Sequence, residues 1–74
     1  MPELPNVSGR EARCAFERLG WIFRRQTGSH MILTNPGSIA SLSIPDHHEL
    51  APGTLRKLIR LAGATVDEFR AAVS

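Results

Sequence analysis

The stretch that decides the fold is WIFRRQTGSHMILT, residues 21–34. It opens with aromatic and β-branched residues, becomes polar, and passes through Thr27-Gly28 into a second apolar run. This pattern predicts two strands joined by a tight turn. We expect the first strand over 21–27 and the second over 30–34. The segments on either side must then pack against this β-hairpin.

The segment after the hairpin predicts a third strand. Asn-Pro-Gly at 35–37 supplies another turn, and the strand is expected over 38–44, where Ala40, Leu42 and Ile44 recur at every second position among polar residues. Such alternation indicates an antiparallel sheet with one covered face and one open face.

Helices are predicted on both sides of the strands. SGRE at 8–11 has the form of a capping box, and apolar residues follow it at helical spacing, so a first helix is expected over about 8–19. A second helix is expected over 52–63, and a further capping box at 65–68 opens a short last helix. The order α-β-β-β-α, with a terminal helix, predicts an α+β fold with its helices on one face of the sheet.

Length and composition indicate a single folded domain over residues 1–74, with residues 1–7 as an extended lead-in. A chain of this size buries roughly 60% of its unfolded surface, which leaves little room for a deep substrate cavity. The 42% hydrophobic and 22% charged residues are ordinary for a folded soluble domain. Shallow surfaces for polymers or protein partners suit such a domain better.

Arginine dominates the positive charge, with eight arginines against one lysine and a net charge of +2. The planar guanidinium matches phosphate oxygens, so this bias favours a nucleic-acid partner, although GC-rich coding has the same effect. Cys14 is the one cysteine, which excludes an internal disulfide, and we expect it to be a buried or half-buried filler on the first helix. Because no apolar leader or spanning segment is present, we predict a cytoplasmic protein without a membrane partner.

A histidine directly after the hairpin turn is the main candidate for chemistry. If Met31 and Leu33 join the core, His30 must lie on the open face of the sheet or at its edge. A histidine both accepts and donates protons near neutral pH. Next to Arg24 and Arg25, it could act on a ribose 2′-hydroxyl while the arginines neutralise the phosphate. The structural alternative is a histidine that fills a polar surface position.

Two further histidines, His47 and His48, lie in the loop before the second helix. They could donate hydrogen bonds to phosphate, or one of them could act as a second proton carrier. The alternative is that they belong to an exposed polar loop without a functional role. Three histidines without a spaced ligand pair make a poor zinc site, so neither a metal nor a cofactor is expected.

The second helix carries a basic set, Arg56, Lys57 and Arg60, away from its apolar stripe. Together with the helix start near Gly53-Thr54, this set is a plausible RNA footprint. A solvated outer helix face explains the same residues equally well, because an amphipathic helix needs polar residues there.

Several of these segments together resemble the HicA (YcfA-like) family, small toxins of type II toxin–antitoxin modules. The resemblance extends over about residues 7–70, and five segments carry it: SGREA at 8–12, Gly20-Trp21, RQ-x-GSH at 25–30, P-x-H at 45–47 and PGTLRKLIRLAG at 52–63. The combination of GSH with P-x-H and GTLRKL is specific, whereas GSH alone would not be.

The resemblance implies a fold like the double-stranded-RNA-binding domain. It also implies an mRNA interferase, an endoribonuclease held inactive by a HicB-type antitoxin. The catalytic histidine of the family corresponds to His30, while Gly28 and Ser29 match the turn before it. His47 matches the histidine of P-x-H, and His48 lies at a variable position.

Two functions are therefore expected as alternatives. In the first, the chain is a metal-independent endoribonuclease in which His30 is a general acid or base and Arg24, Arg25 and Lys57 position the mRNA. In the second, it is a non-catalytic module that binds RNA or a protein partner by shape and charge. Under the first, an acidic antitoxin should cover the histidine.

The open face is also expected to present apolar side chains to the antitoxin, with Trp21 or Ile32 as the candidates. The apolar run Met31–Leu33 directly after the histidine is a departure from the family, and it narrows the polar area available to RNA.

Overall fold

The computed structural model describes residues 3–73 and contains three helices and three strands. In chain order these are α1 (Gly9–Arg18), β1 (Ile22–Thr27), β2 (His30–Thr34), β3 (Ser41–Pro45), α2 (Pro52–Leu61) and α3 (Val66–Val73). The strands form one antiparallel sheet in the order β1-β2-β3. The α+β fold predicted from the sequence, like that of the double-stranded-RNA-binding domain, is confirmed.

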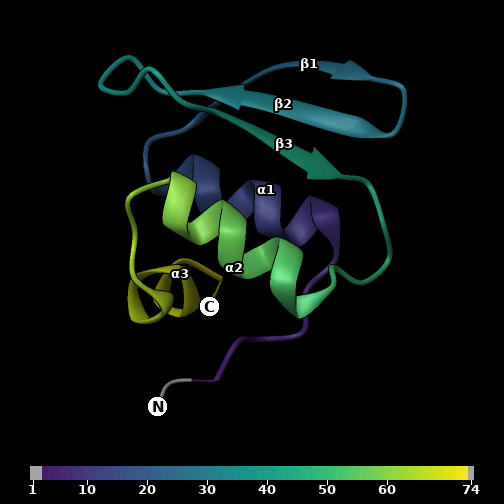
Figure 1. Cartoon of the computed structure of the whole chain (residues 1–74), viewed down its shortest axis with the longest axis vertical. Helices are drawn as coiled ribbons and strands as arrows, with labels where there is room; N and C mark the ends of the chain where they lie inside the picture. Colours follow the sequence, from purple (N-terminus) through teal and green to yellow (C-terminus); the bar gives the residue numbers. More distant parts are fainter. Residues whose placement is uncertain (1–2, 74) are drawn as a thin grey trace.

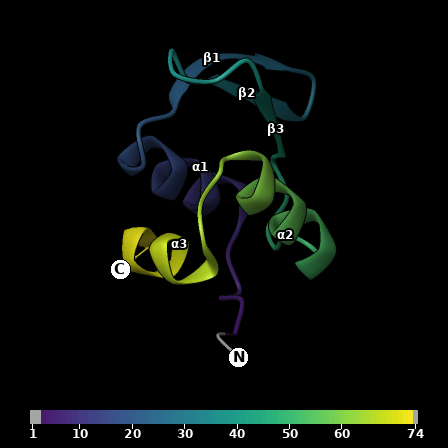
Figure 2. The same ribbon diagram turned by 60° about the vertical axis from the view of Figure 1, so that its left-hand side comes forward.

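The molecule has a sheet layer and a helical layer. Figure 1 shows α1 and α2 side by side beneath the sheet, and Figure 2 shows α3 below them, away from the strands. No element within residues 3–73 covers the other face of the sheet. The alternation of apolar and polar residues in β3 predicted this one-sided arrangement.

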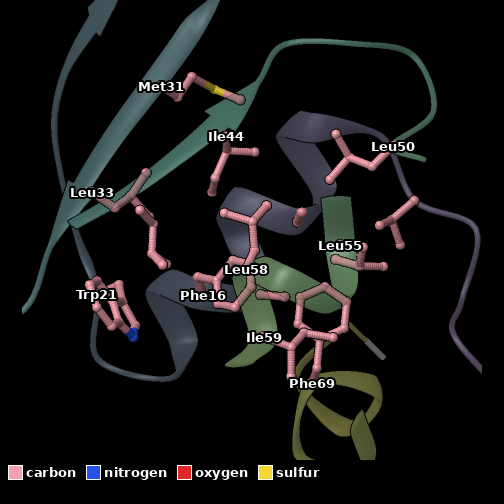
Figure 3. Close-up of a cluster of buried hydrophobic side chains, with 14 residues drawn as sticks. Phe16, Trp21, Met31, Leu33, Ile44, Leu50, Leu55, Leu58, Ile59 and Phe69 are labelled. Carbon is pink, nitrogen blue, oxygen red and sulfur yellow. The ribbon is translucent and has the colours of Figure 1, made fainter. Parts of the chain in front are cut away.

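A single apolar core joins the two layers (Figure 3). Phe16 of α1 and Phe69 of α3 are fully buried, with ring centroids 5.0 Å apart and planes inclined by 48°. Trp21 is only 3% exposed, so the prediction that it lies on the open face is wrong. Trp21, which directly precedes β1, instead belongs to the core (Figure 3).

Local side-chain hydrogen bonds shorten the third strand. It begins at Ser41, whereas the sequence predicted a start at Ser38. The Ser38 hydroxyl accepts from the Ala40 amide at 3.1 Å, and the Asn35 carbonyl accepts from the Ser38 amide at 2.9 Å. These polar groups bind the backbone locally in place of the strand ladder. Ile39 is consequently fully exposed in the β2–β3 loop.

The N-terminal segment was expected to be an extended lead-in over residues 1–7. From Glu3 to Val7 it has no regular secondary structure, and residues 1 and 2 lie outside the described part of the chain. Val7 is 3% exposed, and its carbonyl accepts from the Leu50 amide at 2.8 Å. The lead-in is therefore attached to the core before α1 begins.

The first helix begins at the predicted capping box. The Ser8 hydroxyl accepts from the Glu11 amide at 3.0 Å, and the Ser8 amide donates to the Glu11 carboxylate at 2.8 Å. Cys14 is exposed on this helix, so its prediction as a buried or half-buried filler is wrong. The buried stripe contains Ala12 and Ala15, whereas Cys14 lies on the exposed side of the helix. None of the helices in residues 3–73 has the length and apolar character that crossing a membrane requires.

Candidate functional site

The β1–β2 turn places His30 at the first position of the central strand. Gly28 has a φ of +60°, whereas no non-glycine residue within 3–73 has a positive φ. A positive φ at only the first of the two turn residues is the pattern of a type II′ turn, which follows the twist of the paired strands. The Gln26 side-chain amide donates to the Gly28 carbonyl at 3.1 Å. This hydrogen bond links the turn to the end of β1.

The imidazole of His30 lies on the open face of the sheet. His30 is exposed, whereas Met31 and Leu33 are 1% and 0% exposed. Its neighbours across the ladder are Thr27 on β1 and Pro45 on β3. A side chain in this position can meet a polymer that lies across the uncovered face.

The two arginines of β1 have different positions relative to the histidine. Arg25 pairs with Ile32, so it is the diagonal neighbour of His30 on the same face, about 7–8 Å away along such ladders. Arg24 falls in a β-bulge, and its Nε donates to the Thr34 hydroxyl at 2.8 Å. That bond directs Arg24 to the opposite end of the open face. Only Arg25 is near the histidine.

The β3–α2 loop meets the turn at one end of the sheet. The Asp46 amide donates to the Ser29 carbonyl at 2.7 Å, and the Gly9 amide donates to the His47 carbonyl at 2.8 Å. Figure 1 shows the β1–β2 turn, this loop and the N-terminal ends of α1 and α2 at the same end of the molecule. His47 is therefore brought to the end of the molecule that carries His30.

An open cavity of about 480 Å³ lies beside this meeting point. Its lining consists of Ser8, Arg10, Asp46, His47 and His48. Both histidines of the loop are exposed.

Sequence reasoning missed Arg10 and Gly9, which hold α1 against the loop. The Arg10 guanidinium contacts the Asp46 carboxylate through Nε at 3.3 Å and Nη2 at 3.5 Å. A Cβ at Gly9 would overlap the Pro45 carbonyl oxygen, so the backbones approach closely there. A cation in the first turn of a helix opposes the macrodipole, and this was the one signal in the sequence that set Arg10 apart.

The third basic candidate, Lys57, lies elsewhere. It lines a groove between β3 and α2 together with Ser41, Ser43 and Thr54. Arg56 and Arg60 are exposed on the same helix, as its buried stripe predicted. The Ala51 N-cap of α2 makes no side-chain hydrogen bond. Lys57 therefore lies beside β3, in a groove whose lining contains neither His30 nor the loop histidines.

No group of three or more His, Cys, Asp or Glu side chains within residues 3–73 is arranged to hold a metal ion.

Comparison with known proteins gives a family. The family model described as the HicA toxin of bacterial toxin–antitoxin systems matches residues 9–64, which is more than half of the chain. The match begins with α1, includes the whole sheet, and ends after α2. A search of curated proteins finds no match. The resemblance noted in the GSH and P-x-H segments is confirmed, and the chain belongs to the HicA toxin family of bacterial toxin–antitoxin systems.

Proposed function

We propose that this toxin is an endoribonuclease that cleaves mRNA, with His30 as general acid or base. The observation that carries the proposal is an exposed imidazole, held by a tight turn, on a sheet face that no element within residues 3–73 covers. Membership of a toxin family supplies the biological setting, because RNA cleavage arrests growth by stopping translation.

The proposed reaction is an internal transfer at phosphorus. The ribose 2′-oxygen loses its proton and bonds to the adjacent phosphorus, while the bond from phosphorus to the 5′-oxygen breaks and that oxygen gains a proton. His30 moves one of these protons, and a positioned general acid or base contributes about 10²–10⁴ in rate. Arg25, diagonal to it, offsets the charge that grows on the phosphate oxygens.

Supporting roles are assigned to the other residues of the region. Gly28 and Ser29 form the turn that presents the histidine. His47, on the neighbouring loop, would act as a second proton carrier or as a hydrogen-bond donor to phosphate. Arg24 and Lys57 lie farther along the open face and on α2, where they would bind the RNA chain beyond the cleaved bond.

A HicB-type antitoxin is proposed to silence the toxin by covering the open face. Trp21 cannot contribute to this footprint because it is buried. Ile22, 40% exposed, and the half-buried Ile32 are apolar side chains that this face presents to a partner. Because the surrounding charge is positive, an acidic partner surface fits best.

One observation favours the alternative of a module that binds RNA without cutting it. Within residues 3–73 no group forms a hydrogen bond with the His30 ring, whereas catalytic imidazoles are usually oriented by a second group. An RNA bound across the face would supply that partner under the first proposal and would remain intact under the second.

Replacement of the histidine separates the two functions. We expect His30→Ala to lower RNA cleavage by about 10²–10⁴-fold and to abolish growth arrest on induction. Cleavage by the unaltered toxin should persist in EDTA, because the proposed proton transfers use side chains. Cys14→Ser is the matched control, since it changes an exposed reactive side chain on α1, away from the open face, and should leave cleavage unchanged.

Circular dichroism and thermal unfolding of each variant check that the fold is retained. A His30→Ala protein that still cuts RNA would end the catalytic assignment. An unaltered toxin that binds RNA tightly but never cleaves it would favour the non-catalytic module.

A further inference from the structure

All five residues that line the open cavity beside the β1–β2 turn have polar or charged side chains. Its volume of about 480 Å³ falls within the range of small-molecule sites, about 300–1,000 Å³, and accommodates one nucleotide. Arg10, His47 and His48 provide cationic or proton-donating groups, against one carboxylate from Asp46. This set of donors fits an anionic ligand.

Arg10 contributes little to the free energy of folding. Its side chain is 79% exposed, and exposed ion pairs such as that with Asp46 stabilise proteins by about 0–1 kcal/mol. The first turn of α1 is also an unfavourable place for a cation because of the helix dipole. A guanidinium at such a place is better explained by a ligand than by stability.

Arg10 has N–H donors that its contacts with Asp46 do not use. The contacts with Asp46 use Nε and Nη2, and a guanidinium has five N–H groups in a planar fork, so others remain for a ligand. Asp46 thereby orients the fork and lowers its entropy. The Ser8 hydroxyl accepts from the Glu11 amide, which leaves its own hydrogen available to donate into the cavity.

The cavity is joined directly to the turn that carries His30. Asp46 donates its amide to Ser29, the residue before the histidine, and Pro45 pairs with the histidine itself. An RNA strand whose cleaved bond lies at His30 would therefore pass its next phosphodiester into this cavity.

We propose that the cavity is the binding subsite for a phosphodiester that flanks the cleaved bond, with Arg10 as its anchor and Asp46 as the positioning residue of that anchor. This inference rests on the proposed ribonuclease function, and it gives a substrate contact to Arg10, to which the family resemblance assigned no role.

Two RNA substrates test the subsite. A dinucleoside monophosphate has only the phosphodiester to be cleaved, whereas a tetranucleotide also has flanking ones. We expect Arg10→Ala to lower kcat/KM for the tetranucleotide by about 10–100-fold, the effect of losing a charged hydrogen-bonded contact, and to leave the dinucleoside nearly unchanged. Equal losses on both substrates would place Arg10 at the cleaved phosphate and overturn the flanking assignment.

Binding measured in the His30→Ala background separates this inference from the proposed function. Short single-stranded RNA should bind about 10–100-fold more weakly when Arg10→Ala is added. The slope of log affinity against log salt should fall by about 0.7 for the single phosphate lost. If Arg10→Ala weakens RNA binding in this way but the unaltered toxin cuts no RNA, the subsite is supported and the proposed ribonuclease activity is wrong. If the toxin cuts RNA and Arg10→Ala changes neither binding nor cleavage, only the subsite is wrong.

The matched control is Arg70→Ala, which removes the same charge from an exposed position of α3, the helix on the far side of the helical layer from the sheet. It should leave RNA binding and the salt slope unchanged. Arg10→Lys should keep most of the slope but recover only part of the affinity, because an ammonium lacks the planar fork. If Arg10→Ala weakens the antitoxin complex and leaves RNA binding intact, the cavity holds the antitoxin and the proposal is refuted.

Discussion

Gly9 shows how one hydrogen atom in place of a methyl group determines the contact between α1 and the β3–α2 loop. A Cβ there would overlap the Pro45 carbonyl oxygen, and the Gly9 amide donates to the His47 carbonyl. We expect Gly9→Ala to lower the free energy of unfolding by about 1–3 kcal/mol, the usual effect of overpacking. Urea denaturation measures this. The displaced loop should also lower RNA cleavage.

The control for this substitution is the same chemical change at Gly53, in the first turn of α2. Nothing lies within 4 Å of a Cβ built there, and its φ is not positive. Because alanine is the better helix former, Gly53→Ala should raise the free energy of unfolding by about 0.5–1 kcal/mol. Equal effects of the two substitutions would mean that the close approach at Gly9 has no energetic importance.

Residues with local partners could be predicted from the sequence, and residues with distant partners could not. The Ser8–Glu11 capping box and the glycine of the turn follow from rules that span three or four positions. Arg10 and Asp46 are 36 positions apart in the sequence, so rules that span a few residues could not predict their contact. Cys14 and Trp21 were misplaced for a related reason, since their exposure depends on how the helix and the chain entering β1 are rotated against the core.

Among the elements, α3 has one buried residue, and that residue is one of the largest side chains in the core. Phe69 is fully buried against Phe16, although this helix follows the end of the family match at residue 64. We expect Phe69→Ala to lower the free energy of unfolding by about 3–5 kcal/mol, as for other large core truncations. Chemical denaturation gives the value. Leu61→Ala, at a side chain 44% exposed on α2, should change it much less.

The family match therefore does not include every element on which stability depends. Arg18 of α1 donates to the Ala72 carbonyl at 2.6 Å, a second link between α1 and the last helix. If Phe69→Ala is as mild as Leu61→Ala, α3 is an appendage and the core of this toxin ends with α2.

Element types were easier to predict than element ends. Apolar periodicity, capping boxes and turn residues together identified all six helices and strands of residues 3–73. The start of β3 was wrong by three residues, because the side chains of Asn35 and Ser38 bind nearby amides and compete with the ladder. Such competition depends on local geometry that the alternation of residues does not encode.

At the scale of the whole molecule, the layered fold separates stability from function. We propose that residues 1–74 form one toxin domain in which the helical layer holds the core and the open sheet face binds RNA. The sequence predicted the open face from the alternation in β2 and β3. It did not predict that the turn with His30, the loop with His47 and the start of α1 converge at one end, since that follows from how the layers stack.

This arrangement leads to a prediction about how the antitoxin acts. If it silences the toxin by covering the open face, His30 should become protected in the complex. Diethyl pyrocarbonate acylates exposed imidazoles, and mass spectrometry gives a rate for each histidine. We expect the His30 rate to fall severalfold on complex formation, because the ring is exposed on the free sheet and lies among apolar and basic side chains that a partner would bury. His48, on the loop, provides an internal comparison in the same sample. An inactive complex in which His30 reacts as fast as in the free toxin would show inhibition from another surface, and the basic edge formed by α2 and β3 would then be the place to look.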